Sequence, residues 1–156
     1  MKNYNFEKLL NQYIKERFLF FWRNVNFFRT NKIPNNHQII INDTRIFTKK
    51  ERCELKNKEL KNVVNDIYAF LKNEFLISKS NNICNILENF YRYYVQYIGY
   101  KQNDNNHYIH CNFMLYKSEK WKTDYPRVLG GGSSFWKIEY CIEKRVPYDL
   151  RINAPR

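Results

Sequence analysis

The spacing of apolar residues along the chain predicts three helices. In residues 4–28, large apolar side chains recur every three or four residues, which is typical of an amphipathic helix. Residues 56–75 repeat this spacing, and residues 83–97 carry a third such pattern that ends near Gly99, the expected C-terminal cap. The polar residues 78–82 separate the second and third patterns, with Ser80 or Asn81 as the expected N-cap.

Alternating patterns predict four strands. They cover residues 38–47, 108–116, 135–142 and 148–152, and in the second of them alternate apolar side chains share one face: Ile109, Cys111, Phe113 and Leu115. The predicted order is helix, strand, two helices and three strands. It favours an α+β fold in which two helices pack on a small mixed or antiparallel sheet, with an additional N-terminal helix. We expect a helical extension and linker over residues 1–37 and an α+β domain over residues 38–156.

Charge narrows the choice of partner. The 156 residues contain 27 Lys and Arg against 15 Asp and Glu, a net charge of +12. This excess favours a polyanionic partner, which could be nucleic acid, an anionic membrane or an acidic protein. The longest apolar run, from Phe18 to Trp22, is far too short to cross a bilayer, and no membrane partner is expected.

A basic and aromatic loop is the best local candidate for RNA contact. Its cations could neutralise phosphates while Trp121 or Tyr125 stacks on a base; a merely solvated loop is the alternative. The loop residues are Lys117, Lys120, Trp121, Lys122, Tyr125 and Arg127. A second, weaker group consists of Lys49, Lys50 and Arg52.

Residue types that support catalysis or metal binding are present but scattered. His107, His110 and Cys111 lack a partner carboxylate or a cysteine pair nearby, and Cys53, Cys84, Cys111 and Cys141 form no CxxC. We expect no metal, no cofactor and no enzymatic activity. The glycines at 130–132, followed by Ser133 and Ser134, predict a turn between strands, with a phosphate cradle as the alternative.

Two glutamates near the C-terminus have a plain interpretation. Glu139 and Glu143 are four residues apart, so on one strand they would share a face. Cross-strand ion pairs with Lys137, Arg145 and Arg151 are the expectation, and a catalytic carboxylate pair is disfavoured.

The C-terminal sequence resembles one family. Residues 139–147 read Glu–Tyr–Cys–Ile–Glu–Lys–Arg–Val–Pro, and Leu150–Arg151 follows. This segment is similar to the Glu–aromatic–x–x–Glu–x–Arg–Val–Pro and Leu–Arg segment in the C-terminal domain of the small-subunit ribosomal protein S-three family, bacterial or organellar type, in a divergent or split form. Arg127–Val128–Leu129–Gly130–Gly131 stands near the place of that family's Arg–Leu–Gly–Gly turn. The resemblance covers residues 38–152, with specific identities only in its C-terminal part.

The resemblance implies a function and partners. It implies a structural rRNA-binding protein of the small ribosomal subunit, near the mRNA entry side of the head. We expect the ribosome to be mitochondrial and the gene to be organelle-encoded, since no convincing presequence is seen. Relatives have an N-terminal KH domain and one more C-terminal strand, so a neighbouring ribosomal protein is expected to supply or cover that strand.

The family's basic cluster at the second helix falls on residues 78–82, where only Lys79 is charged. Lys79, Arg145 and Arg151 complete the set of predicted RNA contacts. The alternatives are a virus- or phage-encoded basic protein that binds nucleic acid or inhibits a host factor, and a small nuclease.

Overall fold

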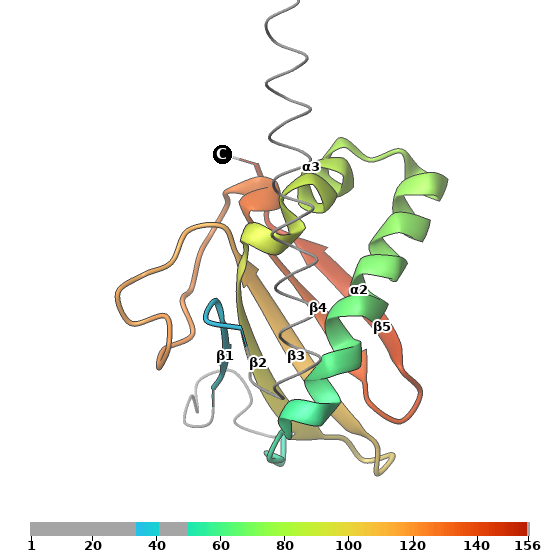
Figure 1. Ribbon diagram of the computed structural model, residues 1–156, viewed down its shortest axis with the longest axis vertical. Helices are drawn as coiled ribbons and strands as arrows, with labels where there is room; N and C mark the ends of the chain where they lie inside the picture. Colours follow the sequence, from blue (N-terminus) through green and yellow to red (C-terminus); the bar gives the residue numbers. More distant parts are fainter. Residues whose placement is uncertain (1–33, 41–49, 156) are drawn as a thin grey trace, which may run out of the picture. The chain divides into compact units, whose positions relative to one another are not determined.

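The computed structural model describes residues 34–40 and 50–155 (Figure 1). The chain divides into two compact units, residues 1–34 and 35–156, and the description below concerns the second. The helix predicted over residues 4–28, Lys49 and most of the strand predicted over residues 38–47 lie outside the described residues.

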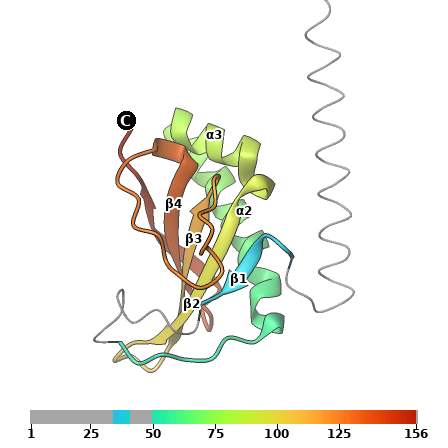
Figure 2. The same ribbon diagram turned by 90° about the vertical axis from the view of Figure 1, so that its left-hand side faces the viewer.

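Five strands form one mixed sheet in the order β1-β2-β3-β4-β5. The first strand, β1 (His37–Ile39), runs parallel to β2 (Tyr94–Lys101). An antiparallel meander continues through β3 (His107–Met114), β4 (Phe135–Cys141) and β5 (Val146–Ile152). Two helices, α2 (Asn57–Ser78) and α3 (Asn81–Asn89), cover one face of this sheet (Figures 1 and 2). The predicted α+β class, with two helices on a small sheet, is therefore confirmed.

The apolar stripe of α2 forms the centre of the helix layer. Leu60, Val63, Ile67 and Leu71 recur every three or four residues, and all four are buried. The helix ends where Lys79 adopts a left-handed conformation (φ 53°) and its N–H donates to the carbonyl of Phe75. Ser80 occupies the N-cap position of α3, as predicted, but its side chain makes no capping hydrogen bond.

The helix predicted over residues 83–97 is wrong in its second half. Helix α3 ends at Asn89, a 3-10 turn η1 (Phe90–Arg92) follows, and β2 begins at Tyr94. Strand β2 is covered on both faces, so its nearly continuous apolar sequence carries no period that separates strand from helix.

Gly99 is a close-approach residue within β2 and not a helix cap. A Cβ atom on Gly99 would lie 2.6 Å from the carbonyl oxygen of Cys53 and 2.7 Å from the side chain of Leu55. The N–H of Cys53 donates to the carbonyl of Gly99 at 3.2 Å. The glycine therefore lets the segment that leads into α2 pass directly over the strand.

Aromatic rings fill the core between the sheet and the helices. Phe113 of β3 stacks on Trp136 of β4 with 3.8 Å between ring centroids, and Phe90 and Tyr93 pack against both rings. These residues point to the helix side because Phe90 also contacts Tyr68 of α2.

Strand β5 forms one edge of the sheet. Among the described residues, none pairs with its outer side. Pro147 has no N–H, and Asp149 has a positive φ of 52°, so the edge is irregular. Neither helix in this part of the structure is long and apolar enough to cross a membrane.

Candidate nucleic-acid interface

The sheet face opposite the helices, here called the open face because neither helix covers it, carries polar and aromatic side chains, most of which are buried. Side chains alternate along a strand, so the neighbours of the core residues Phe113 and Trp136 point away from the helices. Cross-strand register places these open-face residues in three rows: Gln96, Asn112, Lys137 and Arg151; Ile98, His110, Glu139 and Tyr148; Tyr100, Tyr108, Cys141 and Val146.

The β3–β4 loop, residues 115–131, is attached to this face by a buried amide. Gln96 is 0% exposed, and its Nε2 donates to the carbonyls of Trp121 and Asp124. The Gln96 Oε1 in turn accepts a hydrogen bond of 2.9 Å from Asn112 Nδ2. Because buried amides must be paired, these bonds hold the middle of the loop on the sheet.

A second attachment runs through His110. Its Nδ1 lies 2.7 Å from a carboxylate oxygen of Glu139, and its Nε2 lies 2.9 Å from the Tyr125 hydroxyl. Both ring nitrogens are thus engaged, one by the sheet and one by the loop. These two hydrogen bonds therefore connect the loop to the sheet.

Glu139 also accepts a 2.8 Å hydrogen bond from the Tyr100 hydroxyl. Burial, together with hydrogen bonds and the nearby Glu139 charge, raises the pKa of Tyr100 well above its usual value. Burial is also the largest cause of the raised pKa of Tyr148, whose hydroxyl lies 3.4 Å from that of Tyr100. These hydroxyls stay protonated at neutral pH.

The structure buries one of the two rings that we expected to stack on a base. Trp121 is only 4% exposed and packs edge-on against Tyr94, with 5.1 Å between ring centroids. Lys117 lies over the same Tyr94 ring, with Nζ 5.2 Å from its centroid. Base stacking by Trp121 does not fit this burial, and its role is to anchor the loop. Tyr125 is half-buried and its hydroxyl is held by His110.

A groove of about 190 Å³ lies between the loop and β4. Its walls include Asn112, Tyr125, Arg127, Phe135 and Lys137. Asn153, which also lines the groove, holds the end of the loop. Its Nδ2 donates to the carbonyls of Val128 and Gly130 at 2.8 and 3.0 Å. Rings, cations and an amide therefore meet in one hollow on the open face.

The cations of the loop are exposed and carry uncompensated charge. Lys117, Lys120, Lys122 and Arg127 are exposed, and none of them forms an ion pair within the described part of the chain. Arg145 and Arg151 differ, because Arg145 pairs with Asp66 at 3.0 Å and Arg151 pairs with Asp149. The loop cations are the better phosphate ligands, since no internal carboxylate offsets their charge.

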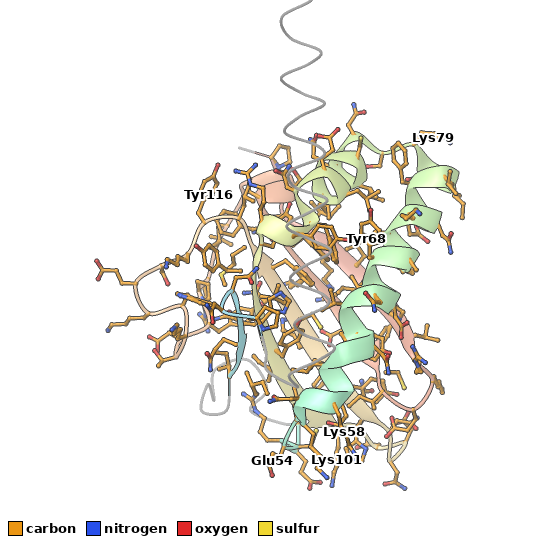
Figure 3. The ribbon with its side chains drawn as sticks, in the orientation of Figure 1. Glu54, Lys58, Tyr68, Lys79, Lys101 and Tyr116 are labelled. Atoms are coloured by element: carbon orange, nitrogen blue, oxygen red, sulfur yellow. The ribbon has the colours of Figure 1, made fainter. Side chains whose placement is uncertain are left out.

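The other predicted contacts are dispersed. Lys50 lies over the Tyr100 ring with Nζ 4.0 Å from the centroid, and Arg52 forms a backbone bridge with Tyr100. Lys79 lies at the C-terminal end of α2, far from Lys58 and Lys101 in Figure 3. Of the predicted contacts, Tyr125 and Arg127 line the groove, whereas Lys79 lies on another element.

The ion pairs expected for the two glutamates are wrong. Glu143 lies in the turn after β4 and pairs with His107 at 2.7 Å, while Glu139 pairs with His110. Burial raises the pKa of Glu143, but hydrogen bonds from His107 and from the backbone outweigh this effect and lower it.

His107 and His110 are three positions apart on β3, so they point to opposite faces and cannot share an ion. Across residues 34–40 and 50–155, no group of three His, Cys, Asp or Glu side chains could hold a metal. In the glycine turn, the N–H groups of Gly132 and Ser134 already donate to the carbonyls of Ala154 and Gly131. This supports a turn between strands, as predicted, and leaves fewer amides for a phosphate.

Sequence reasoning did not identify four residues of this interface: Gln96, Asn112, Phe135 and Lys137. The alternation in residues 108–116 does place Asn112 on the face opposite the core, and this pattern could have indicated its position. No local pattern indicates that Gln96 holds the loop, because its partners are 25 and 28 residues away in sequence.

No protein-family model, curated protein or solved structure gives a significant match to this chain.

Proposed function

We propose that this protein is a non-catalytic RNA-binding component of a ribonucleoprotein particle. The observation that carries the proposal is the β3–β4 loop, which carries four exposed cations without ion-pair partners among the described residues and is attached to the sheet face opposite the helices. Cations fixed in this way bind phosphates without a large loss of loop entropy, and the net charge of +12 adds long-range attraction.

The particle that we propose is the small subunit of a mitochondrial ribosome, with rRNA and neighbouring ribosomal proteins as partners. The support is the C-terminal resemblance to the S-three family. In the structure, the segment with that resemblance forms β4, the following turn and β5. A neighbouring protein strand that pairs with the outer side of β5 remains part of this proposal.

The proposed role is structural. Lys and Arg side chains neutralise phosphates, and the folded domain fixes the path of the RNA.

The test compares two variants of equal charge. In the loop variant, Lys117, Lys120, Lys122 and Arg127 become Gln; in the control variant, the exposed residues Lys56, Lys58, Lys72 and Lys144 become Gln. We expect RNA affinity to fall at least about tenfold in the loop variant, with a salt slope reduced by about one for each lost phosphate contact. Fluorescence anisotropy with labelled RNA at several salt concentrations measures both quantities.

An equal loss in both variants would contradict a localised interface. Co-sedimentation of the native protein with small ribosomal subunits at moderate salt tests the proposed particle. Binding to RNA without such co-sedimentation would favour a different nucleic-acid-binding role.

A further inference from the structure

We propose that the groove between the β3–β4 loop and β4 holds one unstacked base of single-stranded RNA. This inference rests on the proposed function and specifies the form of RNA that the interface takes. The base would lie beside Phe135 and Tyr125, and the phosphates on either side of it would meet Arg127 and Lys137.

The size of the groove suits one base. Pockets for drug-sized ligands typically measure about 300–1,000 Å³. The groove measures about 190 Å³, which suits a single planar ring system better than a larger ligand. Bases inside a duplex are paired and stacked, so only a base that leaves the stack can enter such a hollow.

The aromatic walls are fixed before any ligand binds. The Phe135 ring lies against Gly131, where a Cβ atom would come within 2.7 Å of it. The Tyr125 ring is oriented by the hydrogen bond between its hydroxyl and His110. Rings held in this way lose little entropy when a base stacks on them.

A polar group in the groove can read the edge of a base. Asn112 uses its Nδ2 to donate to Gln96, whereas its Oδ1 accepts no hydrogen bond from any residue that the structure describes. The carbonyl oxygen of an Asn side chain is an acceptor for the exocyclic amino groups of adenine, cytosine or guanine. Uracil has no such amino group, so these three bases are the preferred occupants.

The charge around the groove is positive. Lys137 lies in register with Asn112 on one side and with Arg151 on the other. Arg127 and Lys137 form no ion pair within the described part of the chain. The pKa of Asp149 is lowered by its hydrogen bond to Arg151 and by the charges of Arg151 and Lys137, as expected for a positive local field. Such a field favours the phosphates that flank the base.

The experiment uses the full chain and an oligoadenylate of about ten nucleotides that carries 2-aminopurine at one position. We expect the fluorescence of this base to change on binding, because it moves from the strand onto Phe135 and Tyr125. Phe135→Leu keeps an apolar side chain but removes the ring, and should weaken binding about tenfold and reduce the fluorescence change. Phe70→Leu, which removes a half-buried ring of α2 outside the groove, should change neither.

A second pair of variants covers the case in which Phe135→Leu disturbs the fold. Lys137→Gln should weaken oligoadenylate binding more than Lys144→Gln, which removes an exposed charge in the β4–β5 turn. Duplex RNA should not distinguish Phe135→Leu from the wild type.

If single-stranded and duplex RNA respond alike, or if both pairs of variants behave alike, the groove is not a base-binding site, although RNA binding by the loop cations stands. If the wild-type protein binds no RNA at all, the proposed function fails and this inference fails with it.

Discussion

Two adjacent glycines show how one residue can shape the interface. Gly131 (φ 92°) and Gly132 (φ 54°) both adopt backbone conformations that other residues rarely take. Their surroundings differ: a Cβ atom on Gly131 would collide with the Phe135 ring, whereas one on Gly132 would meet only a Pro155 atom at 4.0 Å. Gly131 therefore serves both the turn and the groove wall, and Gly132 serves the turn alone.

The pair gives a matched test of that difference. Gly132→Ala should cost about 1 kcal/mol through backbone strain. Gly131→Ala should cost about 1–3 kcal/mol more, because Phe135 must move out of its present position. Urea denaturation measures the free energy of unfolding of both variants. Similar losses of stability would show that the position of the Phe135 ring does not depend on Gly131.

At the scale of elements, the β3–β4 loop is held by side chains from two strands. Gln96 of β2 binds its backbone, and His110 of β3 binds Tyr125. The lysines of the loop are exposed, whereas Trp121 in its middle is buried and anchors it. Its position thus depends on polar contacts that are distant in sequence.

Gln96→Met should release this loop. The substitution keeps the length of the side chain but leaves the carbonyls of Trp121 and Asp124 and the amide of Asn112 without their partner. We expect a loss of about 2–4 kcal/mol in the free energy of unfolding. Trypsin should also cleave faster at Lys117, Lys120 or Lys122, as seen by mass spectrometry of timed digests.

Gln102→Met serves as the control, because Gln102 is exposed. It should leave both stability and cleavage nearly unchanged. Unchanged cleavage in Gln96→Met would mean that other contacts hold the loop.

The elements whose apolar residues recur with one regular period were predictable from the sequence. Helix α2 and strands β3 and β4 have clear apolar faces, and their predicted positions agree with the structure within a few residues. Strand β2 was not recognised, because it is buried on both sides and its apolar residues follow no single period. Its β-branched and aromatic residues, such as Val95, Tyr97 and Ile98, were the remaining signal for a strand.

The candidate interface was predictable only in part. The run of cations from Lys117 to Arg127 is visible in the sequence, but the burial of Trp121 is not, because it depends on how the loop folds back onto β2. The groove was not predictable either. Strand register brings Asn112, Phe135 and Lys137 together, and local sequence patterns do not determine register.

On the scale of the whole molecule, tyrosines connect the layers. The Tyr140 hydroxyl donates to Asp66 of α2 at 2.6 Å, and the Tyr93 hydroxyl donates to the carbonyl of Ser133 at 2.6 Å. Burial raises the pKa of Tyr93 to about 12, and burial is also the largest cause of the raised pKa values of Tyr97 and Tyr140. The fold therefore favours the neutral form of these side chains.

This preference predicts an alkaline loss of stability. A tyrosine whose folded pKa exceeds its unfolded value of about 10 contributes fully below pH 10 and loses that contribution as the pH rises towards the folded pKa. For Tyr93 the loss approaches about 3 kcal/mol by pH 12. Urea midpoints measured from pH 8 to about 11.5 should fall steeply above pH 10.

In Tyr93→Phe, the alkaline fall should be shallower, although stability at neutral pH is lower because the bond to Ser133 is gone. The exposed Tyr116→Phe should follow the wild type. Identical slopes in all three proteins would contradict the role of Tyr93.

The placement of the β3–β4 loop also limits the direction from which a long polymer can approach the sheet. The loop is fastened over β2 and β3 through Gln96 and His110, so this half of the open face is already occupied by the chain itself. An extended strand that enters the groove has to run past β4 and β5, beside Lys137 and Arg151, and cannot lie across all five strands. Crosslinks from a bound polynucleotide should accordingly cluster on one flank of the domain.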